Sequence, residues 1–346
     1  MTLDVLLLSD PDLPAELADR LAGELPALLA AHVSDRVDWR VDAVLNPLAG
    51  DEQVSVSTML AVIGSRMPDL GWDYGICLTD LPRRTGRRPV AAELSTTAGV
   101  ALLSLPALGS LRLYPRVRSA VVELIAEMHC GDGSTRPALG RPEPAPSDGT
   151  LFVVPGARGR LRLLAGMVRA NRPWRVFLGL SKALAGVFAA AVFALLTSDV
   201  WRIASSLGPV RQTVIAVVSV ATLVVWLVVD HELWERPSRG RALLYNAATV
   251  LTLGLGVACL YAVSVAALLL AVALVLDPAV VGSTLGHPPG RGDYAAIVAF
   301  TASLAMVGGA LGAGLEDDAA VRQATYGERQ RQRQQAREAE QDERAG

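Results

Sequence analysis

The sequence predicts an α/β soluble domain with a mixed sheet, followed by an all-α transmembrane module of four helices. Two observations support this fold class. Residues 1–130 alternate short apolar runs with amphipathic stretches, and four long apolar segments fill residues 176–315. A helix needs about 20 mostly apolar residues to cross a hydrocarbon core of about 30 Å. The second half of the chain therefore predicts an integral membrane protein, with the lipid bilayer as its first partner.

The expected transmembrane helices cover residues 176–198, 210–230, 243–276 and 294–315. Their apolar cores contain a single charged residue, Lys182, near the start of the first span, where its side chain can reach the interface. Residues 243–276 would form a helix of roughly 51 Å, longer than a bilayer core. We expect one long helix there that is tilted, kinked near Gly254–Gly256, or projecting from the membrane.

Arginine counts between the spans predict their orientation. Six arginines lie between residues 158 and 175, two in the loop 199–211, three in 230–241, one in 277–293, and six after residue 315. Basic residues accumulate on the cytoplasmic side of a membrane. The alternating pattern predicts a multi-pass plasma-membrane protein with both termini in the cytoplasm.

The N-terminal half is expected to be a cytosolic α/β domain over residues 1–130. Period-2 and continuous apolar runs predict strands, 3.6-residue periodicity predicts helices, and the short connections late in the domain require antiparallel pairs. The expected strands are 3–8, 37–45, 74–79, 90–94 and 100–105, and the expected helices are 11–32, 53–66 and 113–130.

Three further segments complete the predicted organisation. Residues 131–155 are rich in proline and glycine and predict a linker. Residues 156–175 are a basic juxtamembrane segment, whose arginines within Arg158–Arg175 either contact anionic lipid as an amphipathic helix or only set the topology. Residues 316–346 form a charged cytosolic tail.

Composition narrows the classes of function. The net charge is −2, so no overall field would attract nucleic acid. All but one of the 32 basic residues are arginine, a bias that lowers the significance of any one arginine cluster. The three cysteines have no metal-ligand spacing and predict no disulfide framework.

Two resemblances follow from particular motifs. The successive runs YGICLTDLP, RPVAAELS and AGVALLSLPAL, followed by a helix, resemble the core of archaemetzincin-type zinc peptidases. The resemblance implies an HExxH zinc helix, but Glu123 and Glu127 stand at the two histidine positions and Leu124 at the catalytic glutamate, so it implies a lost peptidase site. The runs TDLPRRTGRRPVAAE, LLYNAATVLTLGLGV and GGALGAGLEDDAAVRQATY resemble uncharacterised membrane proteins of actinobacteria and other Gram-positive bacteria.

Three sets of residues are candidate sites. One loop carries an arginine cluster that could bind an anion such as a phosphate, or could be a solvated turn. Glu123, Glu127 and His129 are weak candidates for a metal site, and a solvated helix face is the alternative. Gly308 and Gly312 have the small-xxx-small spacing of packed membrane helices. The arginine cluster consists of Arg83, Arg84, Arg87 and Arg88.

The third span carries the polar residues Asn246, Thr249 and Thr252, which could bond a neighbouring helix or line a path. No Asp, Glu or His lies inside the apolar cores, which argues against proton-coupled transport. We therefore expect a non-enzymatic binding or regulatory membrane protein without a cofactor, which can have a protein partner or form homo-oligomers. The alternatives are a metal-dependent hydrolase or an enzyme acting on phosphate or lipid, and a small transporter or channel subunit.

Overall fold

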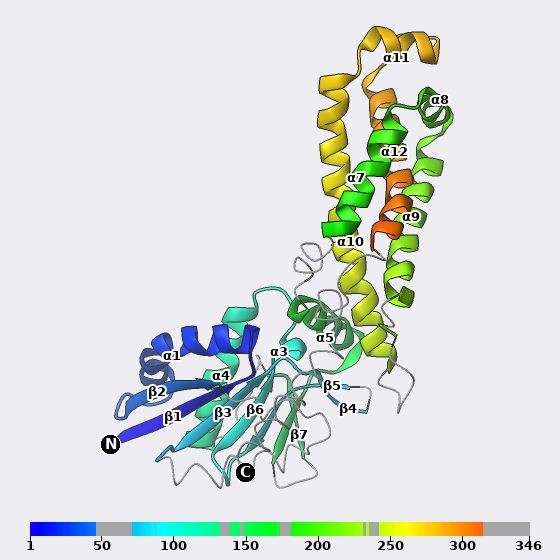
Figure 1. The fold of residues 1–346 in the computed structure, drawn as a ribbon. Coiled ribbons are helices and arrows are strands. Elements are labelled where there is room, and N and C mark those ends of the chain that lie inside the picture. Colours follow the sequence, from blue (N-terminus) through cyan, green and yellow to red (C-terminus); the bar gives the residue numbers. More distant parts are fainter. Residues whose placement is uncertain are drawn as a thin grey trace, which may run out of the picture. The chain divides into compact units, whose positions relative to one another are not determined.

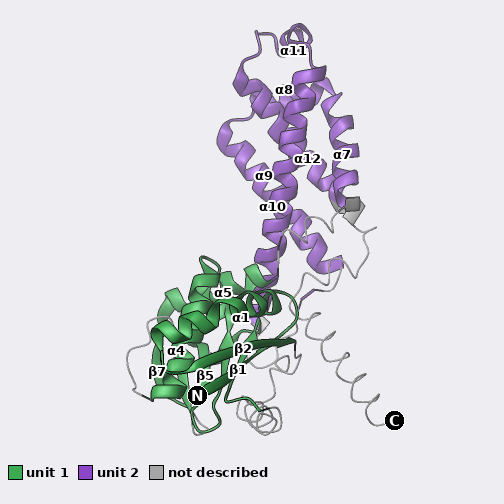
Figure 2. Ribbon diagram, turned by 90° about the vertical axis from the view of Figure 1, so that its left-hand side faces the viewer, with its two compact units in different colours: residues 1–170, 330–346 green, residues 171–329 purple. Residues whose placement is uncertain are grey.

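The structure is a computed structural model that describes residues 1–45, 71–86, 88–131, 139–145, 149–171, 173, 181–230, 233–234 and 242–313. Within the described residues it divides into two compact units, residues 1–170 and residues 171–313 (Figure 2). The expected helix 53–66, Arg87 and the tail 316–346 lie outside the described residues.

The first unit contains a mixed sheet of eight strands within its described residues (Figure 1). The strand order is β2-β1-β3-β6-β5-β8-β7, with β4 paired to β5. The strands β2, β1, β3 and β6 run parallel, and β5, β8 and β7 continue the sheet in antiparallel pairs. The strands are β1 Thr2–Ser9, β2 Asp38–Leu45, β3 Tyr74–Thr79, β4 Arg83–Thr85, β5 Arg88–Ser95, β6 Val100–Ser104, β7 Arg141–Pro144 and β8 Thr150–Val153.

The sequence explains which strands are central. Parallel strands are buried on both faces and read as continuous apolar runs. β1 and β6 have this character, since every residue of β6 is buried and so are the last five of β1. The predicted mixed sheet is therefore confirmed, and its core lies around β1, β3 and β6.

The helices α1 (Leu13–His32) and α4 (Leu113–Cys130) pack against each other and against the parallel strands, so together they cover one face of the sheet (Figure 1). The periodic leucines of α1 and the apolar face of α4 are fully buried, as their spacing predicted. The short helix α3 (Leu105–Leu108) connects β6 to α4.

The prediction of a linker over residues 131–155 is wrong for the part of this segment that the structure describes. β7 and β8 lie there and extend the sheet beyond β5. Proline has no backbone N–H to donate to a neighbouring strand, so it fits best on an edge strand. β7 contains Pro142 and Pro144 and is the last strand in the order. The proline content that suggested a linker instead belongs to an edge strand.

The first unit also extends past residue 130. The helix α5 (Gly156–Ala170), which falls in the predicted juxtamembrane segment, belongs to this unit and packs against α3 and β5. Its buried face includes Leu163, Gly166 and Met167. At Gly166 an added Cβ would lie 2.6 Å from Cα of Pro106, so the two helices touch backbone to backbone.

The second unit consists of helices. Among its described residues, three helices are long and apolar enough to cross a membrane. The number of spans rises to four if the bent pair α7–α8 is one further span. The helices are α7 Ser181–Leu195, α8 Ser198–Ser206, α9 Pro209–Asp230, α10 Ala242–Val275, α11 Pro278–Leu285 and α12 Arg291–Ala313. The predicted long third span is one continuous helix of 34 residues.

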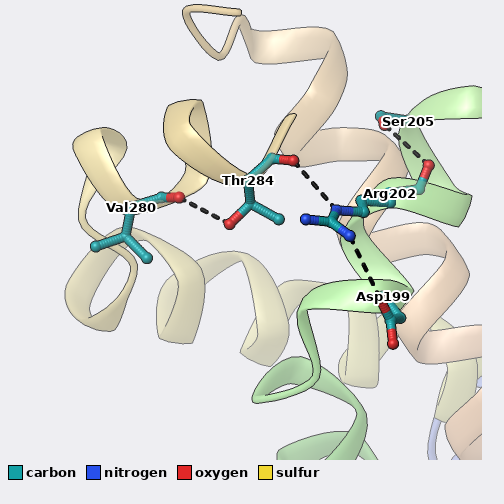
Figure 3. Close-up of polar contacts among 5 residues, drawn as sticks. All are labelled: Asp199, Arg202, Ser205, Val280 and Thr284. Carbon is teal, nitrogen blue, oxygen red and sulfur yellow. Dashed lines mark hydrogen bonds and ion pairs between the residues drawn. The ribbon is translucent and has the colours of Figure 1, made fainter. Parts of the chain in front are cut away.

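Two short helices occupy segments that were expected to be loops. The axis bends by 89° between α7 and α8, and α8 and α11 lie at the same end of the helical unit (Figure 1). Arg202 of α8 connects them, since its Nε donates to the carbonyl of Thr284 at 3.3 Å and its NH1 lies 3.8 Å from Oδ1 of Asp199 (Figure 3). Thr284 in turn donates its hydroxyl to the carbonyl of Val280.

Candidate functional site

Buried carboxylates gather at one edge of the sheet. Among the described residues, the buried charged side chains are Asp10 and Asp80, at 0% and 2% exposure. Asp10 follows β1 directly and Asp80 follows β3 directly, so both stand at the carboxyl ends of neighbouring parallel strands. Ser104, at the carboxyl end of β6, and Thr79, the last residue of β3, are also buried at this edge. We call Asp10, Thr79, Asp80 and Ser104 the edge cluster.

Hydrogen bonds join the edge cluster across three strands. The Thr79 hydroxyl donates to Oδ2 of Asp10 at 2.6 Å and accepts the backbone N–H of Leu81 at 3.1 Å. The Ser104 hydroxyl donates to the carbonyl of Leu81 at 2.7 Å, and the N–H of Asp10 donates to the carbonyl of Leu78 at 3.0 Å. These bonds fix the segment that leads from β3 into β4.

The edge cluster lies at the switch point of the sheet. The chain moves from β1 outward to β2, and then returns to the other side of β1 to form β3. In open α/β sheets, ligands bind outside the carboxyl ends of the strands at such a reversal. Here the reversal lies between β1 and β3, where Asp10 and Asp80 stand.

Burial and the charge of Asp10 keep Cys77, which lies on β3 two residues before Thr79, unreactive. Burial raises the pKa of Cys77 on β3 well above its ordinary value, the charge of Asp10 raises it further, and Arg83 opposes both. Burial also raises the pKa of Glu93, and Arg83 again opposes the shift. Because the thiolate is the nucleophilic form, Cys77 stays a protonated thiol near neutral pH.

The structure separates the described arginines of the predicted anion site. Arg83 and Arg84 are consecutive residues of β4 and therefore point to opposite faces. The charge of Arg83 acts to lower the pKa of Cys77 and of Glu93, whereas NH1 of Arg88 donates to Oε1 of Glu143 at 2.6 Å. The sequence left open an anion site or a solvated turn for the four arginines. Arg83, Arg84 and Arg88 lie in a β-hairpin whose strands pair directly, and Arg87 is outside the described residues.

The metal candidates lie at the other end of the sheet. Nδ1 of His129 lies 3.2 Å from the hydroxyl of Tyr74, and its ring meets Trp39 edge-on at 5.5 Å between centroids. Tyr74 begins β3, so this aromatic group is roughly 17 Å along the strand from Thr79. Glu123 and Glu127 are half-buried on α4. In the part of the chain that the structure describes, no three His, Cys, Asp or Glu side chains are grouped so as to hold a metal ion.

Polar groups in the helical unit bond within and between helices. Asn246, Thr249 and Thr252 are all buried, and Thr252 donates to the carbonyl of Ala248 and accepts from the amide of Asn171 at 3.1 Å. Further along α10, the Tyr261 hydroxyl donates to the carbonyl of Ala299 on α12 at 3.2 Å. The predicted polar stripe is thus enclosed by protein.

Small residues set the distance between α7 and α12. A Cβ added at Gly308 would lie 2.5 Å from Cβ of Ala190, and Gly309 stands against Val187. The backbones of α7 and α12 therefore approach closely at these two residues. Gly312 lies in the last turn of α12, where side-chain surroundings are outside the described part.

No protein-family model, curated protein or solved structure matches the chain. The edge cluster was not singled out from the sequence. Its signal was an aspartate directly after each of two apolar runs, LLLSD and CLTD, which becomes meaningful only when the two runs are known to be neighbouring parallel strands.

Proposed function

We propose that this protein is a non-enzymatic, membrane-anchored binding protein whose α/β unit takes its ligand or partner at the carboxyl edge of the sheet. The observation that carries the proposal is the location of the buried ionisable groups. Asp10 and Asp80 lie at the switch point of the first unit, whereas the buried polar residues of the helical unit, within its described part, are Asn, Ser and Thr.

This contrast assigns different roles to the two units. A pump or proton-coupled carrier needs ionisable groups inside the membrane. Hydroxyls such as those of Ser219, Thr252 and Ser264 donate to carbonyls of their own helices, which is a packing role. The helical unit therefore acts as an anchor, and recognition belongs to the first unit.

Burial favours binding over catalysis at the carboxyl edge. A catalytic carboxylate must come within hydrogen-bond reach of its substrate. Asp10 and Asp80 are almost inaccessible, and Cys77 is held as a thiol. The edge cluster instead braces the segment that presents Arg84 and Thr85 to the surface of the hairpin.

The same proposal includes the orientation in the plasma membrane. The up-and-down order of α7, α9, α10 and α12 brings the start of α7 and the end of α12 to one end of the helical unit, and α8 and α11 to the other (Figure 1). The arginine-rich segments flank the first end in sequence, which supports a cytoplasmic location for it and for both chain termini.

Site-specific photo-crosslinking in living cells tests the binding edge. A photoreactive residue in place of Arg84 should give a discrete adduct, and one in place of Arg36, exposed at the opposite edge before β2, should not. Asp10→Asn should reduce the Arg84 adduct because it removes the charged acceptor of the Thr79 hydroxyl, while Asp19→Asn on the exposed side of α1 should leave it unchanged. Equal adducts at both edges, or an adduct insensitive to Asp10→Asn, would contradict the assignment.

A further inference from the structure

Three arginines from two helices surround the turn between α3 and α4. NH1 of Arg116 donates to the carbonyl of Leu108 at 2.7 Å, and Nε of Arg162 on α5 donates to the same oxygen at 2.8 Å. NH1 of Arg169, also on α5, donates to the carbonyl of Ser110 at 2.9 Å. We call Arg116, Arg162 and Arg169 the arginine triad.

The triad concentrates positive charge, and among the described residues no salt bridge to a carboxylate balances it. The two donor nitrogens that share the Leu108 oxygen can be no more than about 5.5 Å apart. Burial lowers the pKa of Arg162, and the like charge of Arg116 lowers it further, while no carboxylate of the described residues opposes these effects. Each guanidinium carries five N–H donors, of which the bonds to the turn engage one. An anion placed between these groups would relieve their repulsion and accept further hydrogen bonds.

The turn itself is shaped for this arrangement. Gly109 has φ +88°, a conformation that other residues rarely adopt. A Cβ at Gly109 would lie 2.7 Å from Cγ of Arg162 and 3.2 Å from NH1 of Arg116. Only glycine therefore lets both guanidinium groups close over the turn.

An apolar side chain stands next to the triad. Leu111 follows Ser110 directly and is 75% exposed, and its neighbour Arg112 is exposed as well. An exposed leucine beside basic residues is a combination that binds the boundary between headgroups and acyl chains. In the chain, Arg169 is the second residue before Asn171, where the helical unit begins.

We propose that the arginine triad binds the phosphate group of an anionic phospholipid headgroup, with Leu111 contacting the start of the acyl chains. The proposal rests on the membrane attachment and is independent of the ligand at the carboxyl edge. Under this proposal, Arg162 and Arg169 of α5 bind the headgroup together with the α3–α4 turn. Helix α5 is then not a separate amphipathic helix that lies on the bilayer surface.

Binding to short-chain lipids measures this directly. The full chain in a neutral maltoside detergent is titrated with dihexanoyl phosphatidylglycerol, with dihexanoyl phosphatidylcholine as the zwitterionic reference. Because one basic residue at an anionic surface contributes about 1 kcal/mol, Arg162→Gln and Arg116→Gln should each weaken phosphatidylglycerol binding about fivefold. The matched control is Arg118→Gln, which removes the same charge from α4 at a residue that lies 3.9 Å from Glu24, and it should stay within about twofold of the parent.

Two further variants separate binding from folding and lipid from free phosphate. Arg169→Gln removes an exposed side chain whose hydrogen bond, within the described residues, is to the carbonyl of Ser110, so it should keep the fold and still weaken binding. Leu111→Ala should weaken phosphatidylglycerol but leave binding of inorganic phosphate unchanged. The proposal fails if Arg118→Gln has the same effect as Arg162→Gln, if phosphatidylcholine binds as tightly as phosphatidylglycerol, or if inorganic phosphate binds as tightly as the lipid.

Discussion

The contact between α5 and α3 yields the sharpest prediction about stability. Gly166 of α5 faces the backbone of Pro106. A Cβ added at Gly166 would lie 2.6 Å from Cα and 2.8 Å from the carbonyl carbon of Pro106, and closer still to its carbonyl oxygen. Cβ atoms essentially never come this close to other atoms, and backbone atoms cannot move aside as a flexible side chain would. Gly166→Ala must therefore push α5 away from α3.

The expected cost follows from overpacking. Extra methyl groups in a packed core cost about 1–3 kcal/mol, which raises the population of opened molecules by roughly 5- to 150-fold. Gly23→Ala on α1 is the matched control, because nothing lies within 4 Å of its added Cβ. Replacing a glycine inside a helix by alanine at an open position should stabilise by about 0.5–1 kcal/mol.

Cys77 provides an assay specific to the first unit. It is 3% exposed on β3, whereas Cys130 and Cys259 are exposed and can be replaced by serine and alanine. The rate at which a thiol reagent modifies Cys77 then reports how often the unit opens. We expect the thiol reagent to modify Cys77 faster in Gly166→Ala than in the parent, and more slowly in Gly23→Ala. Unchanged modification in Gly166→Ala would show that α5 is not an integral part of the unit's packing.

Three other predictions follow from the structure. Gly308→Leu should lower the melting temperature of the full chain in detergent by several degrees because it separates two helices, while Gly254→Leu, which has open space at its Cβ, should not. Burial holds the pKa of Cys77 above its unfolded value, so this thiol's contribution to stability is complete below about pH 9 and declines as the pH rises further. Calorimetry of a Cys77→Ala variant should show a shallower alkaline decline. In intact cells a membrane-impermeant maleimide should label a cysteine placed at Ser283 of α11 but not the native, exposed Cys130, and the reverse pattern would overturn the orientation.

Hydrophobic periodicity predicted most of the regular structure. The strand 74–79 and the helix 113–130 have the predicted bounds, because each has a distinct apolar pattern and an abrupt end. Helix α4, for example, ends at Gly131 in the left-handed conformation, a common helix terminator. The mixed sheet followed from the short connections between β3, β5 and β6.

The misassigned elements share a physical cause, which is dependence on partners distant in sequence. β7 contains two prolines and has little apolar character, and it is a strand only because β8 pairs with it. The arginines of α5 left open a lipid-contacting helix or a topology determinant, and neither interpretation anticipated that the opposite face of α5 packs against α3. The same limit applies to the edge cluster, whose members Asp10 and Asp80 are 70 residues apart and meet only through the pairing of β1 and β3.

The length of α10 explains why its polar stripe need not be a path through the membrane. Its 34 residues extend roughly 51 Å, against about 33 Å for the 22 residues of α9. Exposed apolar side chains occur along the whole of α10, from Leu243 to Val275, and the part from Leu255 to Leu274 alone is about 20 residues long, enough to match a bilayer core. A bilayer core of about 30 Å placed over this part leaves the first turns outside the hydrocarbon. Asn246 and Thr249 lie in those first turns, where buried polar groups hold neighbouring segments together at less cost than within lipid. The excess length of α10 thus supports a helical unit that extends beyond the hydrocarbon at the N-terminal end of α10.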